Sequence, residues 1–167
     1  MEKCEVCGFA WETVDRDEIG RRVDAGTARI AALIVADPAR SAVRPTAQRW
    51  SATQYAAHVR DVLQTLRDRM VIGIVEDNPS FKPMYRDERV ELGLYDPDPA
   101  EAVATELRAA TAMFTRLFEA VDPRDLSRPV QYGYPSPVQR SLLWMGQQAV
   151  HEVEHHGDDI AENLGAT

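Results

Sequence analysis

Apolar residues recur at helical spacing in four long stretches of the chain, separated by polar segments that contain proline or glycine. These stretches cover residues 15–36, 51–75, 98–121 and 141–164. No segment alternates apolar and polar residues over a useful strand length, and no internal repeat is present. The pattern therefore predicts an all-α protein with four helices.

Local signals at the ends of these stretches support the prediction. Ser51 is followed three residues later by Gln54, which is the spacing of a capping box at a helix start. Asp98 is expected to cap the third helix, with Pro99 in its first turn. Gly165 is expected to stop the last helix. The boundaries of three helices are thus expected from the sequence.

Four helices of this length are typical of a four-helix bundle. We expect an N-terminal segment at residues 1–14, which contains a Cys-x-x-Cys motif, followed by one bundle domain at residues 15–167. The segment between the second and third helices, about residues 76–98, is unusually long for a connection in a compact domain. It therefore reads as a crossover along the length of the bundle.

Composition restricts the functional classes. The 167 residues carry a net charge of −8, which argues against general affinity for nucleic acid. No apolar run is long enough for a membrane span, and the N-terminus does not resemble a signal peptide. The two cysteines are expected to be reduced in such a chain. We therefore expect a cytoplasmic protein that binds neither nucleic acid nor membrane.

The last helix concentrates groups that bind metal ions. Three of the four histidines lie within residues 151–156, where residues four apart share one helix face. Two pairs result, His151 with His155 and Glu152 with His156. The remaining histidine, His58, lies in the second helix and can supply a third ligand. Three protein ligands leave a coordination position open, as catalytic sites require.

This hypothesis constrains the topology of the bundle. His58 lies about two turns from the start of the second helix, and His156 lies about two turns from the end of the fourth. They come level only if these two helices run antiparallel. An up-down-down-up bundle meets this condition, and it requires the long crossover between the second and third helices.

The two histidine segments also carry a family resemblance. "RWSATQYAAHVRDVL", followed about 90 residues later by "HEVEHHGDDI", resembles the DinB-like superfamily of metal-binding four-helix bundles. That group includes mycothiol- and bacillithiol-dependent transferases and mycothiol-dependent maleylpyruvate isomerases. In the family, one ligand comes from the second helix and an i,i+4 pair comes from the fourth, with an aliphatic residue after the pair. Aligning that aliphatic residue with Ile160 implies the ligands His58, Glu152 and His156.

Other readings of the same residues stay open. A register shifted by one would make His151 and His155 the ligating pair. Asp61 and Asp159, each about one turn after a ligand histidine, are expected to orient that ligand as hydrogen-bond acceptors or to be solvated. If Asp61 and Asp159 are simply solvated charges on a helix surface, they do not orient a ligand.

The N-terminal "CEVCGF" offers a second metal site. A single Cys-x-x-Cys is weak evidence, and it also fits a redox pair or two incidental thiols. The turn resembles half of a zinc site, which needs two more ligands. His151 and His155 would complete a Cys2His2 set with Cys4 and Cys7, because they point about 100° away from Glu152 and His156 on the helix.

The resemblance implies a divalent ion, zinc or nickel, and mycothiol as a cosubstrate. The implied function is thiol S-transfer to a small electrophile or thiol-dependent isomerisation. Metal-dependent hydrolysis is an alternative reaction, in which water replaces the thiol. A non-catalytic, metal-binding or stress-associated bundle, as a homodimer through a helix face, is the alternative from another class. The expected partner is accordingly a small molecule.

Overall fold

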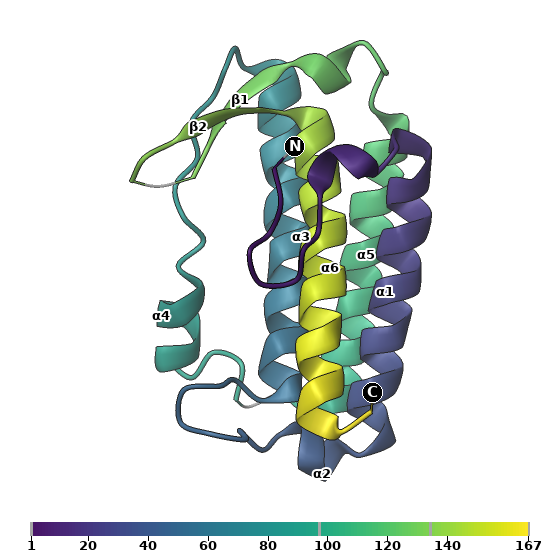
Figure 1. The fold of residues 1–167 in the computed structure, drawn as a ribbon, viewed down its shortest axis with the longest axis vertical. Helices are drawn as coiled ribbons and strands as arrows, with labels where there is room; N and C mark the ends of the chain where they lie inside the picture. The colour runs from purple at the N-terminus through teal and green to yellow at the C-terminus, as the bar shows by residue number, and fades with distance from the viewer. Residues whose placement is uncertain (1, 97, 134, 167) are drawn as a thin grey trace.

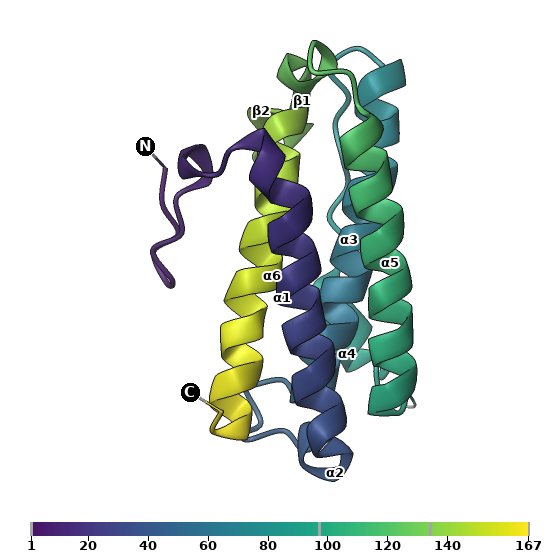
Figure 2. The same cartoon turned by 90° about the vertical axis from the view of Figure 1, so that its right-hand side faces the viewer.

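The computed structural model describes residues 2–96, 98–133 and 135–166. Four long helices lie side by side (Figures 1 and 2). They are α1 (Arg16–Ala36), α3 (Ala52–Val75), α5 (Ala100–Ala120) and α6 (Leu142–Leu164). These four elements agree with the four stretches expected from the apolar pattern, and they confirm the all-α bundle.

The topology is also the expected one. In Figure 1, α1 and α6 run downwards, whereas α3 and α5 run upwards. Helices α1 and α3 each pack against both α5 and α6. The order along the chain is therefore up-down-down-up, with α3 antiparallel to α6. The crossover between α3 and α5 returns the chain to the other end of the bundle (Figure 1).

Capping explains where the helices begin and end. The Ser51 side chain accepts a hydrogen bond from the Gln54 amide, and the Gln54 side chain accepts one from the Ser51 amide. Gly165 adopts a positive φ of 62° at the end of α6, a conformation that costs glycine little.

The prediction that Asp98 caps α5 is wrong. Pro99 occupies the N-cap position, and no side-chain capping hydrogen bond is found there among the described residues. Asp98 instead lies 3.5 Å from Arg60 on α3 (Oδ2 to Nη1), so its carboxylate is used in an ion pair between elements. The capping preference of aspartate is weaker than this tertiary contact.

The core lies between the four long helices and is built from aliphatic and aromatic side chains. At Gly146, an added Cβ would lie only 2.4 Å from a ring carbon of Phe118. This glycine therefore lets α6 approach the side chains of its neighbours more closely than an alanine would.

Shorter elements lie at both ends and along one side of the bundle (Figure 1). They are α2 (Pro38–Ser41), α4 (Arg86–Glu91), the 3-10 helices η1 (Trp11–Thr13) and η2 (Asp125–Ser127), and the strands β1 (Pro129–Tyr132) and β2 (Val138–Ser141). The two strands form an antiparallel pair that the sequence pattern did not reveal, because each has only four residues.

The crossover contacts this strand pair. The Gln131 amide donates to the Pro79 carbonyl at 2.8 Å, and the Phe81 amide donates to the Gln131 carbonyl at 3.3 Å. The crossover then descends along the outside of α3 to α4 (Figure 1). Among the described residues, no helix combines the length and the apolar character needed to cross a membrane.

Candidate metal centre

The structure brings His58, Glu152 and His156 together. His58 projects from α3, and the other two residues project from α6, one turn apart. The Nε2 atoms of His156 and His58 lie 3.4 Å and 3.7 Å from the same Glu152 oxygen, Oε2. One potential ligand atom from each residue lies within 4.8 Å of the other two. Antiparallel packing of α3 and α6 is what makes this meeting possible.

His156 is held between two carboxylates. Its Nδ1 atom lies 2.9 Å from Asp159 Oδ2, so a proton on Nδ1 leaves Nε2 free as a ligand atom. Burial lowers the pKa of His156, but hydrogen bonds and attraction from Asp159 and Glu152 outweigh burial and the net pKa is raised. The two carboxylates therefore favour a positive charge on the His156 ring.

Glu152 is oriented by a neighbour on the same helix. The Gln148 Nε2 atom donates to Glu152 Oε1 at 2.6 Å, which leaves Oε2 directed at the two histidines. Burial raises the pKa of Glu152, but hydrogen bonds from His156 and His58 dominate, so the net pKa is lowered and the carboxylate stays ionised. Among the described residues, no lysine or arginine hydrogen bond is found at Glu152 Oε2, so the two histidines are the partners of this oxygen.

His58 completes the cluster as a potential ligand from α3. It is only 2% exposed, and burial lowers its pKa. The Trp50 ring packs edge-on against the imidazole, with centroids 5.3 Å apart. A neutral imidazole is the form that binds a metal ion.

These residues fit a divalent ion. In a tetrahedral site with nitrogen and oxygen ligands at about 2.1 Å, ligand atoms lie roughly 3.4 Å apart. The two measured distances to Glu152 Oε2 are close to this value, so small side-chain adjustments suffice. Two imidazoles and one carboxylate also match the ligand set of known catalytic zinc sites. The donor chemistry and the geometry therefore agree.

Two cavities adjoin the cluster. One, of about 310 Å3, is lined by His156 and Arg86, among other residues. The other, of about 190 Å3, is lined by His58, Glu152, Arg69 and the same Arg86. Within the described residues, no serine or cysteine lines either cavity. The cavities give small molecules access to the cluster, and the positively charged side chains of Arg69 and Arg86 lie beside it.

Several residues of the smaller cavity were not expected from the sequence. The Arg69 guanidinium lies over the rings of both Phe81 and Tyr132, each at 5.3 Å from the centroid. Phe81 belongs to the crossover and Tyr132 belongs to β1. Gln148 could have been found from its i,i+4 spacing to Glu152, whereas the Arg69 contacts depend on packing between distant segments.

The two residues expected beside the ligands differ in their contacts. Asp159 lies against His156, as described above. Asp61 instead accepts hydrogen bonds from Arg60 at 2.9 Å, Arg89 at 2.6 Å and Tyr95 at 3.0 Å. None of the hydrogen bonds found for Asp61 in the described residues involves a ligand histidine. Asp61 therefore attaches the crossover to α3, close in sequence to His58.

The alternative pair faces elsewhere. His151 and His155 stack on each other on another face of α6, with ring centroids 5.3 Å apart. They lie beside Cys4 and Cys7, and the structure groups His58 with Glu152 and His156. The two interleaved pairs therefore fall into two different groups of potential ligands, and His155 and His156 also form a third group with Asp159.

An up-down-down-up four-helix bundle with a His-Glu-His cluster between α3 and α6 defines a recognisable class of helical protein. The family model of the DinB superfamily matches residues 22–160, and the chain belongs to this superfamily. This finding confirms the resemblance seen in the two histidine segments.

A solved structure with the same fold supports the assignment. YfiT from Bacillus subtilis, described as a probable metal-dependent hydrolase with an unusual four-helix bundle topology, matches with a TM-score of 0.78. The match covers 100% of this chain and 95% of that chain at 14% sequence identity. At this identity, the likeness concerns the fold. No curated protein matches the chain in sequence.

Proposed function

We propose that this protein is a metal-dependent enzyme that uses a low-molecular-weight thiol of the mycothiol type to attack a small, negatively charged electrophile. The observation that carries the proposal is the convergence of three ligand atoms on one point beside two solvent-accessible cavities. Zinc or nickel suits the His-Glu-His donor set. The thiol is what membership of the superfamily suggests.

Each residue of the cluster has a separable task. His58, Glu152 and His156 would hold the ion, while Asp159 fixes the tautomer of His156 and Gln148 fixes the orientation of Glu152. A divalent ion held in this way would lower the pKa of a thiol or water and polarise an oxygen atom.

The charge around the smaller cavity supports a negatively charged substrate, whereas the larger cavity also has Asp87 and Asp159 in its lining. Arg69 and Arg86 line the smaller cavity, and Arg86 also lines the larger one. Arginine binds carboxylates through its fork of N–H donors. We infer that the two guanidinium groups attract and orient a carboxylate of the substrate next to Glu152.

The cavities also suggest why the nucleophile comes from outside. No cysteine or serine lines them in the described part of the chain, and Thr65 is the hydroxyl residue of this type in the smaller one. We infer that the attacking atom arrives with a cosubstrate. In the transfer reaction, a sulfur–carbon bond forms while the bond from carbon to the leaving group breaks. The thiol proton and the leaving group go to solvent.

Hydrolysis is the second candidate reaction. It is favoured by the fold that the chain shares with YfiT, which is described as a probable metal-dependent hydrolase. The same cluster would then act on water, and no thiol would be needed. The two reactions differ in their dependence on thiol, which an assay can measure directly.

The test uses untagged protein loaded with zinc or nickel. Mycothiol and a carboxylate-bearing alkylating electrophile are supplied, and the S-conjugate is measured by mass spectrometry. A carboxylate-bearing ester without thiol forms the hydrolytic arm. Glu152→Gln is compared with Glu154→Gln, because Glu154 lies two residues away on the same helix and pairs only with Arg22 among the contacts found.

We expect Glu152→Gln to reduce the metal affinity of the His58 cluster and conjugate formation by more than about 10-fold each, since loss of an orienting partner alone typically costs 10–100-fold. Glu154→Gln should retain both. If only the ester arm gives product, the proposed reaction is hydrolysis and not thiol transfer. Equal activity of the two variants, or of metal-free protein, would overturn the metal-dependent function.

A further inference from the structure

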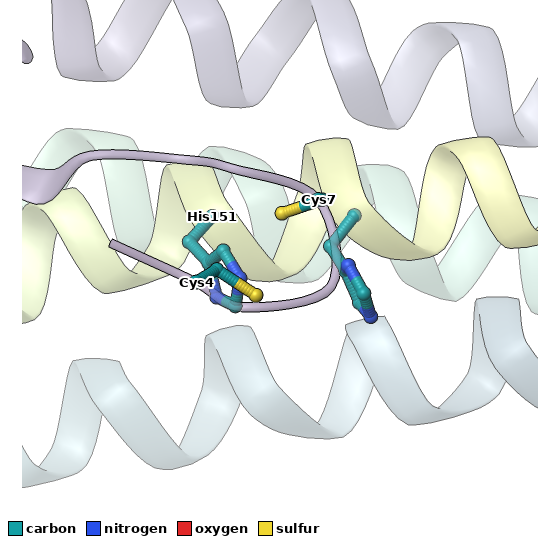
Figure 3. Close-up of side chains that lie close together, drawn as sticks. Cys4, Cys7 and His151 are labelled. Atoms are coloured by element: carbon teal, nitrogen blue, oxygen red, sulfur yellow. The ribbon is translucent and has the colours of Figure 1, made fainter.

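The N-terminal Cys-x-x-Cys loop lies against α6 at the pair of histidines that the first cluster leaves unused. Cys4, Cys7, His151 and His155 each offer a ligand atom within 4.8 Å of the other three. Figure 3 shows the Cys4 and Cys7 side chains directed into the space within the loop, beside the His151 ring. The four groups come from segments about 145 residues apart in sequence, so folding alone assembles them.

The loop that carries Cys4 and Cys7 is a tight turn closed by backbone hydrogen bonds. Gly8 has a positive φ of 74°, and its amide donates to the Cys4 carbonyl at 2.9 Å. The Cys4 amide donates to the Phe9 carbonyl at 2.8 Å, so two backbone hydrogen bonds close the loop around the two cysteines.

His151 provides an independent sign of a missing partner. It is 9% exposed, and neither of its ring nitrogens has a hydrogen-bond partner within the described residues. The rings of Phe9 and Trp11 pack against it at centroid distances of 5.2 Å and 4.9 Å. A buried imidazole with both nitrogens unpaired is unusual unless a ligand satisfies one of them.

We propose that Cys4, Cys7, His151 and His155 bind a second metal ion, a structural zinc. Two thiolates and two imidazoles are the Cys2His2 set that selects zinc in tetrahedral geometry. All four positions are filled by protein, so this ion has no open position for substrate. It differs in this respect from the three-ligand cluster on the neighbouring face of α6.

The second site has a structural consequence for the first. The Trp11 indole donates to Gln148 Oε1 at 2.7 Å, and Gln148 in turn donates to Glu152 at 2.6 Å. The zinc would fasten residues 4–7 to α6, close to Trp11 and to this chain of hydrogen bonds. The N-terminal segment would therefore help to orient the carboxylate of the other cluster.

The experiment measures metal content and thiolate ligation in the whole chain without a tag. Elemental analysis of the zinc-loaded protein is compared for the wild type, the Cys4→Ser/Cys7→Ser double variant, His58→Gln and the loop control Glu5→Gln. Cobalt-substituted samples are examined for the thiolate-to-cobalt charge-transfer band. Circular dichroism verifies that each variant retains its helices.

The wild type and Glu5→Gln should bind two ions per chain and show the charge-transfer band. The double cysteine variant should lose one ion and the band. His58→Gln should lose one ion but keep the band, which separates this inference from the proposed function. A wild type that lacks the band, or a double variant with unchanged zinc content, would overturn the second site. A Cys4–Cys7 disulfide that persists in protein purified and assayed under reducing conditions would overturn it as well.

Discussion

Replacing Asp61 by asparagine tests whether this buried carboxylate holds the crossover or serves the metal cluster. Its side chain is 8% exposed and accepts hydrogen bonds from Arg60, Arg89 and Tyr95. Asparagine has the same shape and keeps one acceptor oxygen. It removes the negative charge and turns an N–H group towards donors. The substitution therefore weakens the attachment of the crossover to α3 without opening a cavity.

The expected cost follows from the partners. Tyr95 can keep an acceptor in the Asn oxygen, and Arg60 retains ion pairs with Glu106 and Asp98. The main loss is the charged hydrogen bond to Arg89. Such bonds contribute about 1.5–3 kcal/mol, and the lower part of this range applies because Arg89 is 38% exposed. Adding about 0.5 kcal/mol for the weakened Arg60 contact gives a loss of roughly 2 kcal/mol.

Thermal unfolding is the assay. For a chain of this size, 2 kcal/mol lowers Tm by about 4–8 °C. Asp68→Asn is the matched control, since Asp68 lies on the same helix, is 68% exposed and pairs only with the partly exposed Arg67 among the ion pairs found. It should change Tm by no more than about 2 °C.

Metal content measured on the same samples distinguishes the two roles of Asp61. We expect Asp61→Asn to bind as much metal as the wild type. A variant that keeps its Tm but loses metal affinity would refute the reasoning and assign Asp61 to the cluster.

Three further predictions follow from particular contacts. Gln148→Leu should weaken metal binding at the His58 cluster by about 10–100-fold in a chelator competition, because Glu152 loses its orienting donor; unchanged affinity would contradict this role. Gly146→Ala should destabilise the fold by about 1–3 kcal/mol in urea unfolding, since the new Cβ meets an aromatic ring at 2.4 Å. Gly157→Ala on the same helix should instead stabilise by about 0.5–1 kcal/mol, because its nearest atoms lie at 3.5 Å or beyond. A reversed order of these two glycine variants would refute the packing argument.

The helices and their order were accessible from the sequence because they depend on local signals. Periodic apolar residues, the capping box at Ser51 and the glycine at residue 165 each act within a few residues of chain. The topology followed from one extra condition, the meeting of His58 with a pair on α6. The length of the crossover, which is a property of the sequence, agrees with that condition.

The surroundings of the cluster could not be predicted in the same way. Asp61 looked like a partner of His58 one turn earlier, but donors from the crossover compete for its carboxylate more effectively. Asp98 likewise forms an ion pair with Arg60 and does not cap the helix as expected. In both cases a charged side chain had a local option and a distant one, and only folding decides between them.

The sequence by itself determined which residues are able to bind metal ions and on which faces of the last helix they lie, because helical geometry fixes the angle between neighbours. Only the tertiary structure decided which other residues lie next to them. It placed His58 beside Glu152 and His156, brought the cysteine loop beside His151 and His155, and set Arg69 and Arg86 around the cavity. The physical reason is that the spacing of side chains along a helix is a local property, whereas contacts between segments depend on how the whole bundle packs.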